Sequence, residues 1–416
     1  MKLDSFISSD DFRREARRRL PKPIFDFVDS GAGAEGTTRA NEEAFHAIKF
    51  RPRQLVDISG RSQRTTVLGR SVEMPVLLGP AGTARLVHRD GELAAVRAAS
   101  RMGTVYCLST GASCSIEEVA EAAGGGTLWF QVYMWRSREL VESLISRAER
   151  AGYHAIILTV DTATAGRRDR DLRNGLLAQR TMRQFGNHAK LTVVPRLTIG
   201  TVVNTLMRPR WLMRHYLLAP PITFKVVSAE DVRMSATTWG GPGMIQKRMS
   251  ETATWEEVRW IRRLWQGPFI IKGILTAEDA HLAFDNGADA VIVSNHGGRH
   301  QDGLPATIDV LPRVVAVAAK RGKEVFIDGG VRRGIDVVKA IALGARGCLI
   351  VRPYYWALAV DGEKGVLKLL TELKVEIDSC LGHLGRPVLD DLDPSALDFT
   401  VAPWHRSAVR GNPSGD

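Results

Sequence analysis

The sequence predicts an α/β fold: a (β/α)8 (TIM) barrel with an N-terminal helical cap and a long insertion after the fourth strand. Two observations favour this fold. Eight short apolar runs recur along the chain, and amphipathic helical patterns lie between most of them. The runs are continuous rather than alternating, as expected for parallel strands that are covered on both faces. A doubly wound open sheet is the alternative, but eight strand–helix units with polar residues at the strand ends favour the barrel.

The predicted strands are regularly spaced except at one point. The helical patterns between them, such as GELAAVRAASRMG and GIDVVKAIALGA, place apolar residues at i, i+3 and i+4 and end in a small residue. Roughly a hundred residues separate the fourth strand from the fifth, far more than a βα connection needs. We therefore expect residues 165–255 to form an elaborated loop at the C-terminal ends of the strands. The eight strands are residues 75–79, 104–109, 127–133, 154–161, 268–273, 289–295, 324–330 and 348–353.

Three regions follow from this division of the chain. Residues 1–70 are predicted to cap the barrel with helices, one of which, LPKPIFDFVDSG, ends at Gly31. The barrel and its insertion cover residues 71–385, and residues 386–416 form a C-terminal extension and tail.

Composition excludes several classes of protein. The chain is 44% hydrophobic and 25% charged, as expected for a globular protein with a large core. Its four cysteines form no CxxC or Cys/His cluster, so we expect buried free thiols and no metal site. The N-terminus lacks the apolar region of a secretory signal, and no apolar stretch approaches the ~18 residues of a membrane span. These features predict a cytoplasmic protein.

Polar side chains gather at the predicted strand ends, where barrels of this kind carry their chemistry. A charged residue at one strand exit is usually a solvated loop residue, but six strands ending in this way indicate a site. The residues are Gln131, Tyr133, Thr159, Asp161, Arg168, Lys272, His296, Arg299, Asp328, Gly330, Arg332 and Arg352.

The residue types at these ends indicate redox chemistry on an acid. The glycine-rich turn DGGVRRG opens a helix and suits a phosphate group. His296 is the histidine at a strand end, and Asp161 could orient it as a general base. Arg168 and Arg299 could clamp a carboxylate, and Lys272 suits a partner that becomes anionic. A flavin or similar cofactor fits this set, although spacing alone does not name it.

Six motifs carry a resemblance to a known family. SNHGGR with Asp302, FQVY, LTVDT, GRRDRDLRNG, IKGI and DGGVRRG occur in order. Together they resemble the FMN-dependent α-hydroxy acid oxidases and dehydrogenases, which include glycolate oxidase and bacterial L-lactate and mandelate dehydrogenases. The resemblance runs from about residue 10 to 385. It implies FMN as cofactor, an L-2-hydroxy acid as substrate, and a quinone, another carrier or oxygen as electron acceptor.

The resemblance also implies a role for individual residues. His296 takes a proton and is paired with Asp161, Arg168 and Arg299 bind the substrate carboxylate, and Tyr133 contacts a substrate oxygen. Lys272 stabilises the anionic reduced flavin, and the phosphate end lies at Asp328, Gly330, Arg332 and Arg352. The implied cofactor contacts are Pro80, Ala81, Gly82, Ser109, Gln131, Thr159, Lys272, Ser294, Asp328, Gly330, Arg332, Val351 and Arg352.

Four positions bear on what the site works on. Phe27 stands where the family commonly has a tyrosine that helps to hold the carboxylate, and Val351 replaces a glycine near the phosphate. Gly111 replaces a bulky aromatic and predicts room for an aryl or longer substrate side chain. Gly82, where oxidases often carry alanine, favours a dehydrogenase.

In the SNHGGRHQDG stretch, His300 is interpreted as a loop residue, and Asp302 as a residue that fixes the loop.

The insertion contributes much of the positive charge. Residues 180–225 mix Arg and Lys with Leu, Met, Trp and Tyr, and RPRW resembles a segment of membrane-associated family members. They form either a lid or a peripheral membrane contact at the inner membrane face. Nucleic acid binding is disfavoured, and the resemblance implies a homo-oligomer, a tetramer by analogy. Two alternatives stay open. One is the same fold working as an oxygen-using oxidase or monooxygenase, or as an oxidase of an amine-bearing natural product. The other is a flavin-binding protein without turnover.

Overall fold

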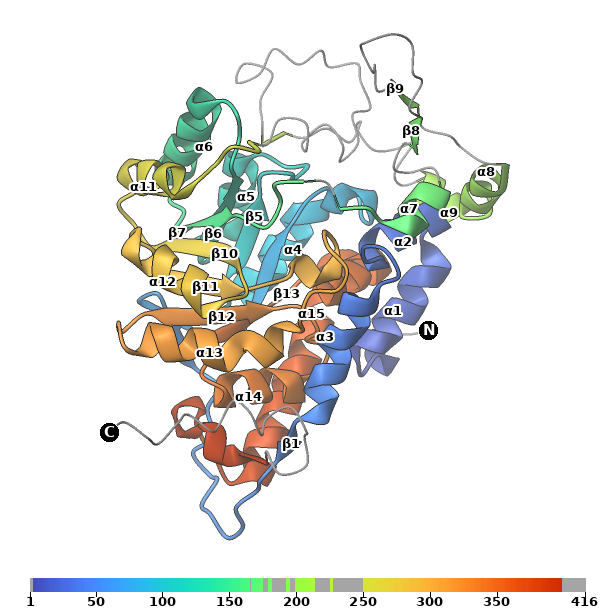
Figure 1. The fold of residues 1–416 in the computed structure, drawn as a ribbon. Helices are drawn as coiled ribbons and strands as arrows, with labels where there is room; N and C mark the ends of the chain where they lie inside the picture. Colours follow the sequence, from blue (N-terminus) through green and yellow to red (C-terminus); the bar gives the residue numbers. More distant parts are fainter. Residues whose placement is uncertain are drawn as a thin grey trace.

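The computed structural model describes residues 3–164, 166–174, 179–181, 192–194, 199–213, 225–226 and 250–398. Eight parallel strands close into one barrel in the order β10-β11-β12-β13-β4-β5-β6-β7 (Figure 1). The predicted barrel is therefore confirmed. The strands are β4 (Val76–Ala81), β5 (Tyr106–Ser109), β6 (Leu128–Tyr133), β7 (Ala155–Thr159), β10 (Phe269–Ile274), β11 (Ala290–Val293), β12 (Glu324–Asp328) and β13 (Gly347–Ile350).

Helices follow these strands and cover the outside of the barrel (Figure 1). Several of their N-termini carry the side-chain caps that free backbone N–H groups need, as at Ser115 and Thr254. The helices are α4 (Gly91–Arg101), α5 (Ile116–Ala123), α6 (Arg138–Arg150), α11 (Trp255–Leu264), α12 (Ala277–Asp285), α13 (Thr307–Ala319), α14 (Gly334–Ala342) and α15 (Arg352–Leu384).

The eighth strand ends earlier than the sequence predicts. Strand β13 stops at Ile350, and Arg352 is the first residue of α15 rather than a strand residue. The reason is Pro353, which follows at once: its fixed φ suits the first turn of a helix. Arg352 therefore approaches the barrel mouth from a helix N-terminus.

The N-terminal region covers the barrel at a side and at the bottom. Helices α1 (Ser9–Arg19) and α2 (Lys22–Asp29) pack against α15, and α3 (Gly36–Ala47) packs against α13 (Figure 1). The hairpin of β2 (Thr65–Val67) and β3 (Arg70–Val72) inserts Val67 and Val72 among the side chains inside the barrel. Strand β1 (Lys49–Phe50) pairs with β14 (Leu397–Asp398), which ties the start of the chain to its end.

Part of the insertion is described. It contains α7 (Asp169–Arg173), the paired strands β8 (Gln179–Thr181) and β9 (Thr192–Val194), α8 (Ile199–Leu206) and α9 (Pro209–Leu212). The remainder of the predicted lid or membrane segment, and the tail after residue 398, lie outside the described residues.

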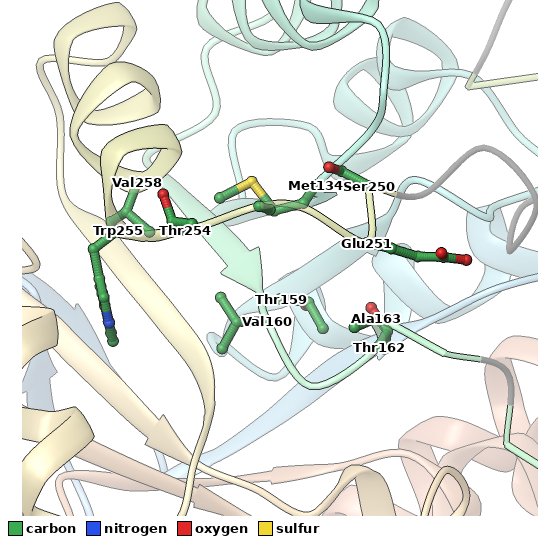
Figure 2. A pocket seen from close by; sticks show the side chains of 11 residues that line it. Met134, Thr159, Val160, Thr162, Ala163, Ser250, Glu251, Thr254, Trp255 and Val258 are labelled. Atoms are coloured by element: carbon green, nitrogen blue, oxygen red, sulfur yellow. The ribbon is translucent and has the colours of Figure 1, made fainter.

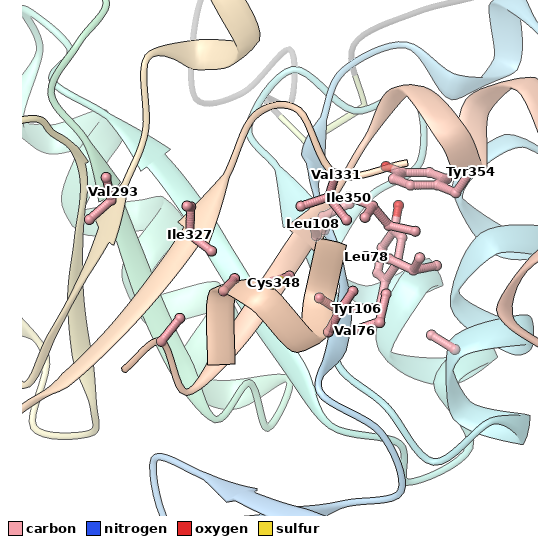
Figure 3. Close-up of a cluster of buried hydrophobic side chains, with 14 of the residues drawn as sticks. Val76, Leu78, Tyr106, Leu108, Val293, Ile327, Val331, Cys348, Ile350 and Tyr354 are labelled. Carbon is pink, nitrogen blue, oxygen red and sulfur yellow. The ribbon is translucent and has the colours of Figure 1, made fainter. Parts of the chain in front are cut away.

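Side chains of the barrel strands alternate between two buried layers, which explains the continuous apolar runs. Outward residues such as Val76, Leu78 and Ile350 pack against the helices (Figure 3). Inward residues fill the barrel itself. The inward positions are apolar at the lower end of each strand, and on six of the eight strands they become polar near the C-terminal end. The apolar inward residues on the strands include Leu77, Cys107, Trp129, Ile157, Ile270, Ile292, Phe326 and Leu349.

Candidate active site

The inward positions at the C-terminal strand ends hold a connected polar layer. Because side chains alternate with a period of two, the residues two positions beyond the apolar interior face the same way. Ser109 Oγ donates to Gln131 Oε1 at 3.0 Å. The polar inward residues are Ser109, Gln131, Tyr133, Thr159, Lys272, Ser294 and Asp328, all of which the resemblance had assigned to cofactor or substrate.

Lys272 is the buried cation of this layer. Its Nζ donates to Ser294 Oγ at 2.7 Å and lies 3.0 Å from Asp328 Oδ2. Burial would lower the pKa of Lys272, but the carboxylates of Asp328 and Asp161 raise it above its ordinary value. The side chain therefore stays charged at neutral pH inside the barrel mouth.

His296 follows β11 in a loop with an unusual backbone. His296, Gly297 and Gly298 have φ values of 55°, 62° and 71°, in the left-handed region. A Cβ at Gly298 would lie 2.8 Å from the backbone nitrogen of Thr38, so only glycine fits there. Asn295 anchors the loop, because its side-chain amide exchanges two hydrogen bonds of 2.8 and 2.9 Å with that of Asn41.

His296 and Asp161 are directly paired across two loops. His296 Nδ1 lies 3.0 Å from Asp161 Oδ1. Burial alone would raise the pKa of the Asp161 carboxyl, but the charges of His296 and Lys272 hold it well below its ordinary value. Asp161 is therefore a carboxylate at neutral pH, and it accepts the hydrogen bond from Nδ1–H. When the imidazole is neutral with its hydrogen on Nδ1, the lone pair is on the other ring nitrogen, Nε2.

Two arginines and Phe27 form one cluster beside the histidine. Arg299 donates to the carbonyl oxygens of Ser30 at 2.9 Å and Phe27 at 2.8 Å, at the end of α2. Arg168 donates to Asp171 at 2.6 Å. The Phe27 ring contacts both guanidinium groups, at 5.5 Å from Arg299 and 5.8 Å from Arg168. Phe27 therefore touches both residues predicted to bind the carboxylate.

Asp171 pairs with Arg168, whereas the hydrogen bonds of Arg299 named above go to carbonyl oxygens and not to a carboxylate. Burial and the neighbouring charges of Arg168 and Arg352 together lower the pKa of Arg299 to about 9. Burial and the charge of Arg332 likewise lower the pKa of Arg352 to about 10. Arginines that repel one another in this way favour an anion between them.

The predicted phosphate end gathers residues from β12, β13 and α15. Arg352 donates to the carbonyl oxygens of Gly297 and Ser30, both at 2.9 Å. Arg332 donates to Glu42 at 2.7 Å and its guanidinium lies over the Trp356 ring. Gly330 has a φ of 92°, and a Cβ there would lie 2.2 Å from the Asn41 carbonyl oxygen.

Val351 is accommodated by a glycine that the sequence did not single out. A Cβ built on Gly79 would lie 3.0 Å from Val351 Cγ2. The valine side chain therefore occupies the space over Gly79, on the inward side of β4. Val351 is also the N-cap residue of α15.

The loop after β4 is held tightly against the loop after β5. A Cβ at Gly82 would lie 2.7 Å from the Gly111 carbonyl oxygen, and that oxygen accepts from Thr83 N–H at 2.9 Å. Tyr355 donates to the Gly82 carbonyl at 2.9 Å. Pro80 and Ala81, at the end of β4, are only partly buried. Gly111 is thus a backbone contact as well as a position without a side chain.

Sequence reasoning missed Glu92 and underrated His300. The buried Glu92 carboxylate accepts from Ala84 N–H at 3.0 Å and Ser113 N–H at 2.9 Å, and so joins the same two loops. His300 lies against His296, with ring centroids 4.3 Å apart. Asp302 accepts from the backbone of Ala34 and Thr37, as expected of a residue that fixes the loop.

A recess lies next to this site, lined by residues at and after the ends of β6 and β7, Thr159 among them, and by residues between 250 and 258 (Figure 2). Of the described residues that line it, only Glu251 is charged, and apolar side chains such as Met134, Val160 and Val258 form its walls. It therefore lacks the clustered cations and the paired base of the barrel mouth, which is the better candidate for the reaction centre.

Three comparisons with known proteins agree on the relatives of this chain. The sequence model described as FMN-dependent dehydrogenase matches residues 16–399. Glycolate oxidase 1 of Oryza sativa subsp. indica is 39% identical over 384 residues, which cover 92% of this chain and 93% of the relative. (S)-Mandelate dehydrogenase of Pseudomonas putida is 36% identical over 393 residues, 94% of each chain. A crystal structure of the monotopic membrane protein (S)-mandelate dehydrogenase superposes with a TM-score of 0.84 and 36% identity, covering 95% and 99% of the two chains.

The residues of the barrel mouth fit FMN. Several buried polar atoms there have no hydrogen-bond partner among the described residues, and together they offer donors and acceptors to one flat polar ligand. Arg352 Nε, at the predicted phosphate end, is one of the donors. The atoms are Gln131 Nε2, Thr159 Oγ1, Asp161 Oδ2, Asp328 Oδ1 and Arg352 Nε.

Proposed function

Because the chain belongs to the family of FMN-dependent dehydrogenases, we propose that it oxidises an L-2-hydroxy acid to the 2-oxo acid with His296 as the base. The observation that carries the proposal is the His296–Asp161 pair, at 3.0 Å, beside two buried arginines. A binding protein without turnover has no use for a histidine that is oriented by a carboxylate next to an anion site.

In this mechanism, different residues bind the substrate carboxylate and take up the proton that leaves the substrate. Arg168 and Arg299 bind the substrate carboxylate, which relieves the repulsion between them. His296 Nε2 takes the proton, and Asp161 stabilises the imidazolium that forms. The phenol of Tyr133 donates to a substrate oxygen; burial raises the pKa of Tyr133, so the group stays protonated at neutral pH.

FMN, when bound, supplies the acceptor for the two electrons that leave the substrate. Ser109, Gln131 and Thr159 would hydrogen-bond its ring, and Lys272 would place a positive charge beside it. Asp328, Gly330, Arg332 and Arg352 would hold the ribityl phosphate end. Pro80, Ala81, Gly82, Ser294 and Val351 complete the proposed contacts.

Anaerobic titration of the purified holoprotein tests the proposal. We expect L-2-hydroxy acids to bleach the flavin absorbance, with aryl or longer side chains favoured by the absence of a side chain at Gly111. The variant His296→Ala should keep FMN and bleach about 10²- to 10⁴-fold more slowly, the usual contribution of a general base. Unchanged bleaching in this variant would remove His296 from the mechanism.

We also propose that the insertion docks on a membrane surface and that electrons pass to a carrier there. On α8 and α9 and directly after them, the apolar side chains of Val202, Val203, Leu206, Met207 and Met213 are between 43% and 64% exposed. Arg210 lies exposed among them, a combination that suits anionic lipid. No described helix is long and apolar enough to cross a bilayer, so the contact would be peripheral. The structural relative named as a monotopic membrane protein supports this reading.

Co-sedimentation with vesicles that contain anionic phospholipid tests the docking surface. Leu206→Glu and Met207→Glu should each reduce the bound fraction. Val375→Glu, which alters an apolar residue that is 58% exposed on α15, is the matched control and should bind normally. Equal binding by all three variants would exclude this surface.

An oxygen-using oxidase is the second candidate, because a mandelate oxidase variant of 34% identity superposes with a TM-score of 0.76. Peroxide formation measured against dye reduction separates the two acceptors. Phe27 motivates a parallel screen with amine-bearing substrates. The tetramer and the cytoplasmic location stay predictions, which light scattering and cell fractionation can test.

A further inference from the structure

His300 makes contacts that an ordinary loop residue does not need. It lies one residue beyond Arg299, and its ring meets the ring of His296 edge to face, with the centroids 4.3 Å apart and the planes at 75°. It is partly buried rather than exposed. The nearest aromatic neighbour of the proposed base is therefore a second histidine.

His300 also joins the two loops that carry the base and its carboxylate. Its Nδ1 lies 3.3 Å from the carbonyl oxygen of Thr164, three residues after Asp161. A carbonyl only accepts, so Nδ1 carries the hydrogen. The loops touch again at Gly166, where a Cβ would lie 2.6 Å from the Cα of His300. The His296–Asp161 bond thus has a second link beside it.

The backbone around His296 is strained and needs support from the residues that surround it. His296 itself has a left-handed φ, which costs about 1–2 kcal/mol for a residue with a side chain. Two glycines follow it, and glycine restricts the chain least. A strained residue of this kind persists only when its surroundings hold it, and the ring of His300 is part of those surroundings.

His300 stays neutral beside the proposed base. The charged or titratable groups around it are His296, Asp161, Arg168 and Arg299. Burial, and then the charge of His296, lower the pKa of His300 well below its ordinary value, although Asp161 opposes this. A proton taken up at the pair therefore stays on His296, and no second positive charge develops next to it.

We propose that His300 is a positioning residue for the reaction, which holds His296 and Asp161 at hydrogen-bond distance through its ring contact and its link to Thr164. The inference rests on the proposed function, since it needs His296 to be the base. It assigns a role to a side chain that touches neither the proposed substrate cations nor the proposed FMN contacts by hydrogen bond.

Four variants separate the effects of the ring contact with His296, the hydrogen bond to Thr164 and a positive charge at position 300. His300→Phe keeps a ring without the donor, and His300→Asn keeps a donor near the place of Nδ1 without the ring. His300→Ala removes both, and His300→Lys adds a fixed positive charge. His281→Ala, at an exposed histidine on α12 that contacts Arg321, is the matched control.

The measurement is the rate constant of anaerobic flavin bleaching at saturating hydroxy acid, with the Kd of the 2-oxo acid, the FMN content and the melting temperature recorded in parallel. We expect His300→Ala to slow bleaching by about 10- to 100-fold, the scale of a misplaced reacting group. His300→Phe and His300→Asn should each recover part of the loss. His300→Lys should be slower than His300→Ala, because its charge opposes proton uptake at His296. The Kd and FMN content should stay close to the wild-type values.

Several outcomes would overturn the inference. Wild-type bleaching in His300→Ala and His300→Phe would make His300 a loop residue. A loss that follows FMN content or melting temperature in all four variants would make it a structural residue. The variant His296→Ala distinguishes the two proposals: if it bleaches normally, the proposed base fails, and if it is inactive while the His300 variants are normal, only the present inference fails.

Discussion

The lower and upper halves of the barrel interior are built on the same strands and differ in almost every chemical respect. Below, apolar side chains fill the space, as where Trp129 meets Phe326 edge to face at 5.3 Å. Above, polar side chains leave buried atoms without partners among the described residues. The change occurs within two residues on six of the eight strands: Cys107 to Ser109, Trp129 to Gln131, Ile157 to Thr159, Ile270 to Lys272, Ile292 to Ser294 and Phe326 to Asp328.

This difference shows that the lower layer mainly stabilises the fold and that the upper layer is suited to bind a ligand. The lower layer gains free energy by burial and close packing. The upper layer lowers the free energy of unfolding, because it buries donors and acceptors that find a partner only when a ligand binds. Substitutions in the lower layer should change the free energy of unfolding and have little effect on the reaction rate. Substitutions in the upper layer should change ligand binding or the reaction rate and have little effect on the free energy of unfolding, except where a buried charge loses its partner.

That exception gives the largest expected effect. Lys272→Met leaves the Asp328 carboxylate buried without its ion pair, a change that costs about 3–5 kcal/mol in stability. It should also abolish FMN retention or flavin bleaching, because the positive charge of the upper layer is lost. Chemical denaturation of the apoprotein and flavin absorbance measure the two effects.

Lys323→Met is the matched control for that variant. Lys323 also pairs with a carboxylate, Asp289, at 3.1 Å, but both side chains are 32% exposed. An exposed pair contributes about 0–1 kcal/mol, so the control should unfold and bleach like the wild type. Equal losses in the two variants would contradict a special role for the buried pair.

The second prediction concerns the lower layer. Phe326→Ala removes a fully buried ring and should reduce the free energy of unfolding by about 3–5 kcal/mol. The rate of bleaching per bound flavin should change little, because Phe326 lies a layer below the polar residues. Phe326→Leu should cost less than about 1.5 kcal/mol. A large change in rate at normal FMN content would show that the two halves are not independent.

Much of this contrast could be predicted from the sequence. Continuous apolar runs with polar C-terminal ends gave the barrel and the position of its site, because alternation along a strand is a local property. The pairing of His296 with Asp161 was also predicted, first from the residue types at the strand ends and then from the resemblance.

The rest depends on contacts between distant segments. The carbonyl oxygens of α2 that bind Arg299, and the amide pair of Asn41 with Asn295, join residues more than two hundred positions apart. No local pattern encodes such a pair. The placement of Arg352 on the eighth strand was wrong for a local reason, since Pro353 at the start of a helix had been read as the end of a strand.

The third prediction sharpens the comparison within the upper layer. Thr159→Val replaces a buried hydroxyl that has no partner among the described residues with a methyl group of similar size. The apoprotein should therefore become more stable by about 1–3 kcal/mol. The stabilisation gained on adding FMN should shrink by a similar amount, which thermal unfolding with and without FMN measures. A less stable apoprotein would mean that the hydroxyl is satisfied without the cofactor.

The smallest expected effect lies at the rim, where the side chain of Phe27 contacts Arg168 and Arg299 through a ring without a hydroxyl. Phe27→Tyr adds one hydroxyl next to the proposed carboxylate site, and one hydrogen bond contributes about 0.5–1.5 kcal/mol net. The Kd of a 2-oxo acid should therefore fall by roughly two- to tenfold, with little change in melting temperature. Phe25→Tyr is the control: this ring lies on the same helix but is 5% exposed in the core, so its new hydroxyl should lower stability and leave the Kd unchanged. If Phe27→Tyr weakens binding instead, the ring of Phe27 contacts the substrate itself, and the substrate carries an apolar or cationic group at the position where the family holds a carboxylate.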